Sequence, residues 1–297
     1  MKRAAIGLAC LLVAALGCAP KPGYSSPEEA MQALTKAAET GDTKAIATVF
    51  GPGGQEIAES GDPVADQKGR ERYLADVKEG LAFEKNAAGA TVAVLGADKW
   101  PFPVPLVEEN GRWKFDAAAA KEEIVSRRIG GNELHAIATC RAFVDAQREY
   151  AKQGRDGNKP AYAQHLMSTP GKHDGLYWET AEGEPDSPMG LLVAEAAAEG
   201  YTAQSKPVQY HGYYYKSLLS QGPNVSGGAK EFIRNGRMTE GFALVAWPAD
   251  YGNSGIMTFV INQVGIVFQK DLGEKTDETA RAMTPYDPDS TWQPTAD

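Results

Sequence analysis

The sequence predicts an α+β fold with two domains, each of which places its helices before an antiparallel sheet. Apolar residues recur at helical spacing early in the mature chain and again over residues 132–153. Short runs rich in β-branched and aromatic residues follow each helical part, and they are densest over residues 241–273. A chain of 297 residues with 42% hydrophobic and 23% charged residues is long enough to form two such cores.

The first domain is predicted at residues 27–128, as helices followed by a meander of strands. Ser26 can cap a helix and Pro27 suits its first turn, so a helix begins here and ends at Gly41. Asn110-Gly111 between two apolar runs predicts a tight hairpin. We expect further helices at residues 43–50 and 69–80, and strands at residues 90–95, 104–107 and 113–115.

The second domain is predicted at residues 129–297, as one long helix packed on an antiparallel sheet. Asn132 is a suitable N-cap for that helix, and Gly154 ends it. We expect a further helix at residues 189–199, and strands at residues 210–219, 242–247, 256–261 and 266–269.

Residues 1–18 have the pattern of a secretory signal peptide, with a basic start, an apolar run and small residues before Cys18. The segment Ala15-Leu16-Gly17-Cys18 resembles a bacterial lipobox, in which the cysteine is diacylated and becomes the mature N-terminus. This resemblance makes Cys18 the candidate lipidation site and residues 19–26 a tether. It implies an outer-membrane lipoprotein of the cell envelope that faces the periplasm. An ordinary cleaved signal, which leaves a soluble periplasmic protein, is the alternative.

The acidic charge of the chain restricts its partners. The formal net charge is −9, and it becomes −11 when Lys2 and Arg3 leave with the signal peptide. Such a surface repels nucleic acid and anionic lipid. We therefore expect no nucleic-acid partner, and a membrane contact through the lipid anchor only. Cys140 is the one cysteine outside residues 1–18, which excludes an internal disulfide in the folded part.

Each half of the folded part resembles a known structural family. Helices followed by a meander that ends in Gly111, Trp113 and Phe115 resemble nuclear-transport-factor-2-like domains, which are cone-shaped α+β folds. The helix at residues 132–153 with the strands at residues 242–269 resembles the globular domains of type IV pilins and pseudopilins. These resemblances imply a cone-like N-terminal domain and a pilin-like C-terminal domain.

The whole mature chain resembles one family more specifically. The segments that carry this resemblance are KWPFPVPLV at residues 99–107, RIGGNELHAI at 128–137, DGLYW at 174–178, HGYYYK at 211–216 and EGFALVAWPADYG from Glu240. They are similar to the bacterial envelope family catalogued as a domain of unknown function and numbered twenty-nine fifty. The resemblance implies a location in the cell envelope, and it implies no reaction.

The sequence contains no recognisable catalytic or metal-binding pattern. His165, His173 and His211 lie in the second domain, but none has the spacing of a helical zinc motif, and no Gly-x-Ser-x-Gly elbow is present. We therefore predict no catalytic residue, no metal site and no cofactor, and a binding or assembly module in preference to an enzyme. A periplasmic hydrolase that pairs His173 or His211 with an aspartate is an alternative. An accessory subunit of a pilus or secretion system is another.

Aromatic residues of the second domain form the candidate binding surface. Tyr213 and Tyr215 alternate on a predicted strand and share one face, where an aromatic strip can stack on sugars or peptides. The full set is Tyr213, Tyr215, His211, Lys216, Trp178 and Tyr177. We expect its partner to be an envelope protein, a peptide or a glycan. Packing of the same tyrosines under a loop is the alternative.

Overall fold

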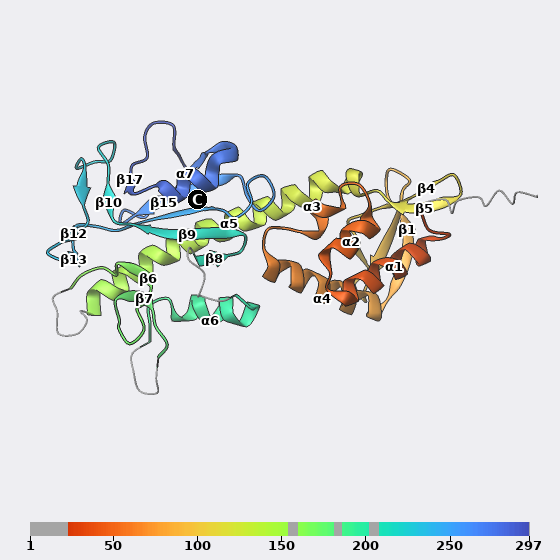
Figure 1. The fold of residues 1–297 in the computed structure, drawn as a ribbon, viewed down its shortest axis with the longest axis horizontal. Helices are drawn as coiled ribbons and strands as arrows, with labels where there is room; N and C mark the ends of the chain where they lie inside the picture. Colours follow the sequence, from red (N-terminus) through yellow and green to blue (C-terminus); the bar gives the residue numbers. More distant parts are fainter. Residues whose placement is uncertain (1–22, 154–159, 181–185, 202–207, 297) are drawn as a thin grey trace, which may run out of the picture.

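The computed structural model describes residues 23–153, 160–180, 186–201 and 208–296. Figure 1 shows an elongated molecule in which two lobes lie along one helix, α5 (Ala117–Gln153). The N-terminal lobe comprises residues 23–116 with the first turns of α5, and the C-terminal lobe comprises the rest of the described chain. The 37 residues of α5 make a rod of about 55 Å. The fold is mixed, with helices and antiparallel sheets, as the sequence predicts.

The N-terminal lobe packs helices against an antiparallel sheet. Its helices are α1 (Pro27–Thr40), α2 (Thr43–Phe50), α3 (Gly54–Ala58) and α4 (Pro63–Glu79), and its strands are β1 (Leu81–Lys85), β2 (Thr91–Leu95), β3 (Trp100–Pro101), β4 (Leu106–Glu109) and β5 (Arg112–Phe115). The strands run in the order β1-β2-β4-β5, and β3 pairs with β2. Ser26 caps α1 as predicted, since its side chain accepts a hydrogen bond from the Glu29 amide.

Four elements of this lobe differ from the prediction. α4 begins at Pro63 instead of residue 69, and α3, β1 and β3 are not predicted. β1 leaves most of its side chains exposed, so it lacks the alternation of apolar and polar residues that marks a half-buried strand. α3 has only five residues, which is too short for a helical period to show.

The core of the N-terminal lobe includes the start of α5. Met31 of α1 is fully buried, and the rings of Phe50 and Phe115 meet edge to face with their centres 5.3 Å apart. Ala117 and Ala120 of α5 are buried in the same cluster. The long helix is therefore part of this lobe as well as of the next one.

The C-terminal lobe is built on a six-stranded antiparallel sheet with the order β18-β16-β15-β14-β9-β8. Its strands are β8 (Val208–Tyr210), β9 (Tyr213–Leu218), β14 (Ala243–Pro248), β15 (Met257–Asn262), β16 (Phe268–Asp271) and β18 (Gln293–Pro294). The elements around the sheet are β6 (His165–Met167), β7 (Gly175–Tyr177), α6 (Gly190–Glu199), β10 (Ser220–Gln221), β11 (Lys230–Glu231), β12 (Ile233–Arg234), β13 (Arg237–Met238), η1 (Gly273–Lys275), α7 (Thr276–Ala282) and β17 (Pro285–Tyr286).

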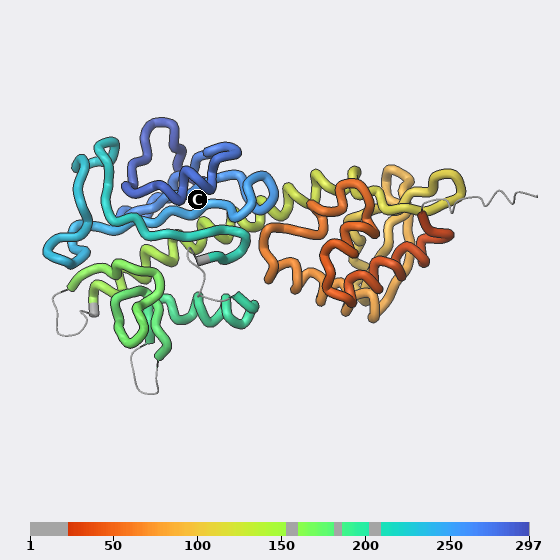
Figure 2. The backbone as a smooth tube through the Cα atoms, viewed as in Figure 1, coloured from red at the N-terminus to blue at the C-terminus, as the bar shows by residue number. Residues whose placement is uncertain are grey.

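This sheet lies between α5 and α7, and every residue of its strand β14 is buried. Side chains alternate along β9, so Tyr215 faces α5, where it interacts with Cys140. Tyr214 faces α7, where the guanidinium carbon of Arg281 lies 5.1 Å from the centre of its ring. The predicted arrangement of one long helix on an antiparallel sheet is confirmed, and Figure 2 shows the path of α5 across the lobe.

The long helix begins earlier than predicted. The sequence places its start at Asn132, but α5 begins at Ala117 and continues through residues 128–129, where the predicted domain boundary lies. Asn132 is inside the helix, and its side-chain amide donates a hydrogen bond of 2.9 Å to the Ser254 carbonyl. The Gly130-Gly131 pair has a low helix propensity, so the sequence does not indicate a continuous helix there. The helix continues through it because α5 packs against both lobes.

The predicted strand at residues 210–219 is a hairpin. β8 and β9 pair around His211 and Gly212, whose φ angles are 47° and 71°. Positive φ at both central residues is the geometry of a type I′ turn. The pairs typical of that turn are Asn-Gly, Asp-Gly and Gly-Gly, so His211-Gly212 does not signal it in the sequence.

The first described residues are attached to the N-terminal lobe. Tyr24 and Trp113 exchange two backbone hydrogen bonds of 2.8 Å, so residues 23–26 of the predicted tether belong to the folded lobe. Cys18 and the predicted signal peptide lie outside the described residues. Within the described residues, no helix combines the length and the apolarity needed to cross a membrane.

Candidate functional site

The candidate residues on β9 lie on opposite faces of the sheet. Tyr213 and Tyr215 face α5 and are buried, with 0% and 4% of their surface exposed. Lys216 faces α7, and its ammonium group donates to the carbonyl oxygens of Ala280, Arg281 and Met283 at 2.6–3.0 Å. Lys216 therefore caps the end of α7 and is not free to bind an anionic ligand.

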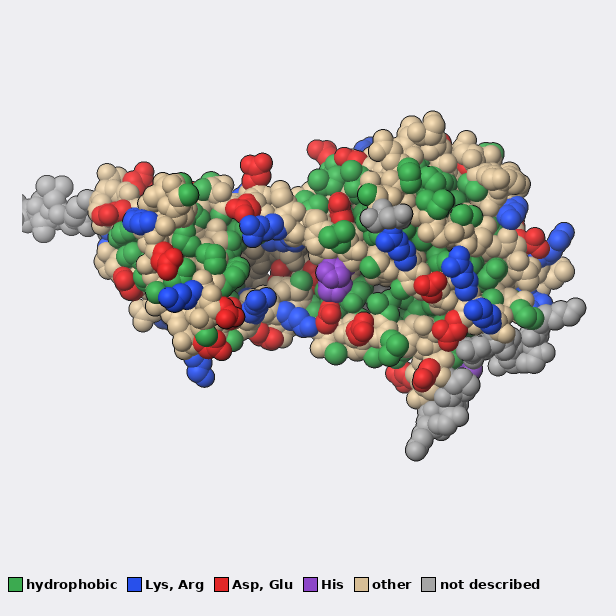
Figure 3. Space-filling view, turned by 180° about the vertical axis from the view of Figure 1, so that it is seen from behind, with side chains coloured by type: hydrophobic (Ala, Val, Ile, Leu, Met, Phe, Trp, Pro, Cys, Tyr) green, Lys and Arg blue, Asp and Glu red, His purple; other side chains and the backbone are tan. Residues whose placement is uncertain are grey.

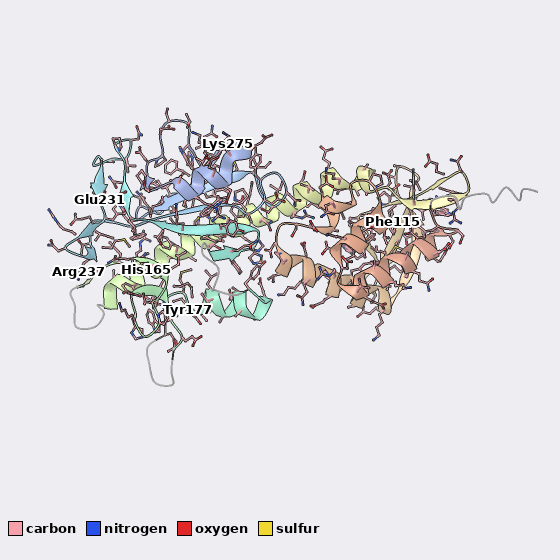
Figure 4. All side chains as sticks on the ribbon, viewed as in Figure 1. Phe115, His165, Tyr177, Glu231, Arg237 and Lys275 are labelled. Atoms are coloured by element: carbon pink, nitrogen blue, oxygen red, sulfur yellow. The ribbon has the colours of Figure 1, made fainter. Side chains whose placement is uncertain are left out.

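The other candidates lie on three different elements. His211 occupies the turn between β8 and β9, and Trp178 is buried against the ring of His173 at 4.5 Å. Tyr177 ends β7 and is half-buried, and Figure 4 shows it beside α6. The six candidates thus do not form one exposed surface, because strand alternation and the two covering helices separate them. Of the six, Tyr177 and Tyr215 line the same pocket.

This pocket is an apolar cavity of about 70 Å³ beneath α6. Its walls include Thr139 and Phe143 from α5, Tyr177 from β7, Leu192, Val193 and Ala196 from α6, Tyr215 from β9 and Leu244 from β14. None of the described side chains that line it carries a charge. No residue of α6 is fully buried, so this helix covers the pocket without belonging to the main core. Apolar lining with a few polar groups is typical of sites that bind small molecules.

The hydroxyl of Tyr215, a residue that lines this pocket, is itself fully buried. Among the described residues, the hydroxyl of Tyr215 forms no hydrogen bond of good geometry, although the Thr139 side chain approaches it. Burial raises the pKa of Tyr215 well above its ordinary value, so the phenol stays neutral and keeps its proton. A buried hydroxyl without a well-formed hydrogen bond is costly.

A buried carboxylate joins the two lobes next to this pocket. Asp62 is only 2% exposed, and its Oδ1 accepts from the Val64 and Ala65 amides, each at 3.1 Å, which caps α4. Its Oδ2 accepts from the Tyr201 hydroxyl at 2.6 Å and from the Gly212 amide at 2.8 Å, both in the C-terminal lobe. The N-terminus of α4 is therefore fixed to the hairpin and to the end of the α6 segment.

Charged groups surround the same junction. Arg128 of α5 donates to the carbonyl oxygens of Glu56 and Ile57 at 3.0 and 3.3 Å, and it also bonds to the Asn253 side chain. Burial lowers the pKa of Arg128, and burial raises the pKa of Asp66 nearby. A polar cleft of about 440 Å³ opens here, and Figure 3 shows charged side chains and a histidine around the narrow part between the lobes.

His211 does not form the pair with an aspartate that the alternative of a hydrolase requires. His211 Nε2 lies 3.2 Å from a carboxylate oxygen of Glu199, and its ring stacks on that of His135 with the centres 4.2 Å apart. Burial, and then the neighbouring His135, lower the pKa of His211. In the part of the chain that the structure describes, neither His211 nor His173 forms an ion pair with an aspartate, and no three His, Cys, Asp or Glu side chains converge as metal ligands.

A comparison with known families decides where this chain belongs. The model of the family described as "Protein of unknown function (DUF2950)" matches residues 21–295. The chain belongs to this family. The predicted family membership is confirmed over nearly the whole chain. No curated protein and no solved structure matches the chain, so the likeness of its halves to nuclear-transport-factor-2-like and pilin domains stays a prediction.

Several residues of the site are not among the candidates that the sequence predicts. Thr139 and the apolar side of α6 line the pocket, and Asp62 fixes the neighbouring junction, yet none of them is among the candidates. Asp62-Pro63 has the same pattern as Ser26-Pro27, an N-cap residue followed by proline in the first turn. The start of α4 could therefore be predicted from the sequence. No local pattern indicates that α6 covers Tyr215, because that contact joins separate parts of the chain.

Proposed function

We propose that this chain is an exported, lipid-anchored protein of the bacterial cell envelope that acts as a binding module. Its C-terminal lobe would hold an apolar group of the ligand in the pocket beneath α6. The single observation that carries the binding role is this uncharged pocket, walled by α5, α6 and the sheet. Apolar walls favour a small molecule or an apolar side chain of a peptide or protein over a glycan, which presents mostly hydroxyl groups.

The first residues of the chain support export and anchoring. The basic start and the apolar run fit a signal peptide, and Cys18 ends a lipobox-like segment. The family match starts at residue 21, three positions after Cys18. Several acyl chains on one cysteine would hold the protein firmly on a bilayer, at about 0.8 kcal/mol per buried methylene. Without acylation, the same leader gives the soluble periplasmic form.

The histidine geometry supports binding more than hydrolysis. His211 lies next to Glu199, but the thiol of Cys140 is buried and its pKa is raised by burial to about 12, so it is not a nucleophile. Ser254 is 0% exposed, and its hydroxyl bonds to the backbone of Asp250. Among the described residues of this neighbourhood, the general base of a hydrolase would have no activated partner.

Anchoring is tested by the mass of the mature N-terminal peptide in the native host and in a Cys18→Ser variant. We expect a diacylated or triacylated cysteine in the wild type and loss of membrane attachment in the variant. An unmodified N-terminus at another residue would refute the anchor and leave the soluble periplasmic form.

Binding is tested with benzene as a small apolar probe, followed by methyl NMR of Leu192 and Val193. Val193→Phe fills the pocket and should abolish the shifts of the remaining methyl groups. Leu191→Phe is the matched control, because Leu191 lies on the same helix but is 84% exposed and does not line the pocket. Equal binding by both variants, or no shift in the wild type, would refute the pocket as a binding site.

A further inference from the structure

One wall of the pocket beneath α6 is bonded to the N-terminal lobe. Tyr201, which follows α6, and Gln209 of β8 both line the pocket. The Tyr201 hydroxyl donates to Asp62 Oδ2 at 2.6 Å, and the side-chain amide of Gln209 donates to the Gly61 carbonyl oxygen at 2.9 Å. Two consecutive residues of the other lobe therefore hold two side chains of this wall.

The end of α6 also lies directly against the start of α4. Gly200 ends α6 with a φ of 102°, and a Cβ at this position would lie 3.5 Å from Cγ1 of Val64. Glu199, the last residue of α6, has a carboxylate oxygen 3.2 Å from Nε2 of His211. Tyr210 lines the pocket, and its ring centre lies 4.1 Å from that of His211. The helix that covers the pocket is thus held at the junction of the lobes by its C-terminal end.

Of the elements around the pocket, α6 is the one that can respond to a bound group. No residue of α6 is fully buried, whereas every residue of β14 in the sheet is. Elements with few buried contacts open locally at a lower free energy than the core. An apolar group in the pocket would add dispersion contacts to the rings of Tyr201 and Tyr210, and it keeps these contacts only while both rings stay in the wall. Such a group therefore favours the arrangement in which Tyr201 reaches Asp62.

We propose that an apolar ligand in the pocket strengthens the junction between the lobes, because it fixes Tyr201 and Gln209 where they bond to the other lobe. This inference rests on the proposed binding function and names how occupancy of that site is transmitted. Gly61 and Asp62, which accept the two bonds, also line the polar cleft between the lobes, so occupancy of the pocket affects the wall of that cleft. By linkage, whatever strengthens the junction also strengthens binding of the ligand.

Hydrogen exchange of the Gly212 amide reports opening of the junction, because this amide donates to Asp62 at 2.8 Å. It is measured by NMR on the purified protein with and without benzene, whose binding is followed at the methyl groups of Leu192 and Val193. If benzene binds only while the two wall bonds are formed, then benzene at about ten times its dissociation constant should slow this exchange about tenfold. The Gly265 amide, which bonds at 2.9 Å within the turn between β15 and β16, is the control and should change less than about twofold.

The double variant Tyr201→Phe/Gln209→Met removes both bonds and keeps side chains of similar size in the wall, so benzene should slow its Gly212 exchange less than about twofold. Tyr213→Phe is the matched control, because it removes a hydroxyl that donates to the Met257 carbonyl outside the pocket, and it should keep the full effect. If benzene binds the wild type without slowing Gly212 exchange, or slows it equally in the double variant, the inference is overturned while the proposed binding function stands. If benzene shifts no methyl group of the wild type, the binding function itself fails, and the inference fails with it.

Discussion

Replacement of Asp62 by alanine is expected to destabilise the protein strongly, because its carboxylate serves both lobes. The variant loses the N-cap of α4, which contributes about 0.5–2 kcal/mol. It also leaves the Tyr201 hydroxyl and the Gly212 amide unpaired in a buried site, at about 1–3 kcal/mol each. Removal of a buried charge offsets part of this cost. We expect the free energy of unfolding to fall by about 3–5 kcal/mol.

Urea unfolding of the purified protein measures this change, with Asp42→Ala as the control. Asp42 caps α2 in the same way but is exposed and makes its cap bond only within the N-terminal lobe. Its replacement should cost about 1 kcal/mol. Asp62→Asn should fall between the two, since its oxygen can keep the cap while its amide group faces the Gly212 amide. Losses for Asp62→Ala and Asp42→Ala that agree within about 0.5 kcal/mol would refute the role of the inter-lobe bonds.

Three further predictions concern the same region. The lowered pKa of His211 means that the unfolded chain binds more protons in weak acid, so stability should fall as the pH drops below about 6.5 and stay constant above it. His211→Asn, which suits the positive φ, should flatten this dependence in unfolding curves from pH 5 to pH 8, and an unchanged slope would contradict the assignment. Gly212→Ala should cost about 2–3 kcal/mol, because its Cβ would lie 2.5 Å from the Asn132 amide nitrogen at a φ of 71°. The control Gly252→Ala has open space at a φ of 80° and should cost only about 1 kcal/mol; equal losses would show that the close contact is relieved. Cys140, whose thiol is fully buried with its pKa raised by burial to about 12, should resist iodoacetamide in the folded protein, as peptide mass spectrometry can measure; labelling as fast as in urea would contradict its burial.

The predicted elements succeed where the signal is local. Ser26-Pro27 marks the start of α1, and the Asn110-Gly111 turn falls between β4 and β5, because caps and tight turns depend on a few consecutive residues. The apolar runs near the C-terminus become the central strands β14 and β15. The same local reasoning fails for α5, where Asn132 looks like a cap. The residues before and after Asn132 are both helical, because tertiary contacts stabilise α5 there. The sequence does not reveal these contacts.

The candidate site was predicted less well, because its parts are distant in the chain. Alternation along β9 correctly places Tyr213 and Tyr215 on one face. It does not tell which face is covered, and both tyrosines are buried under α5. It also does not reveal that Lys216 is held by the backbone at the end of α7. Burial of a strand depends on what packs against it, and that information is not local.

The sequence by itself determined the class of fold, the family, the sites of most helices and of the main strands of the C-terminal sheet, and the leader pattern on which the proposal of export depends. Composition, periodicity and capping residues act over short distances along the chain, so they can be recognised without coordinates. Only the tertiary structure decided that one helix serves both lobes, that Asp62 meets Gly212 across 150 residues, and that α6 covers an apolar pocket lined by Tyr215. Such contacts arise when separate segments bury apolar surface together, and no stretch of consecutive residues specifies which segments will meet.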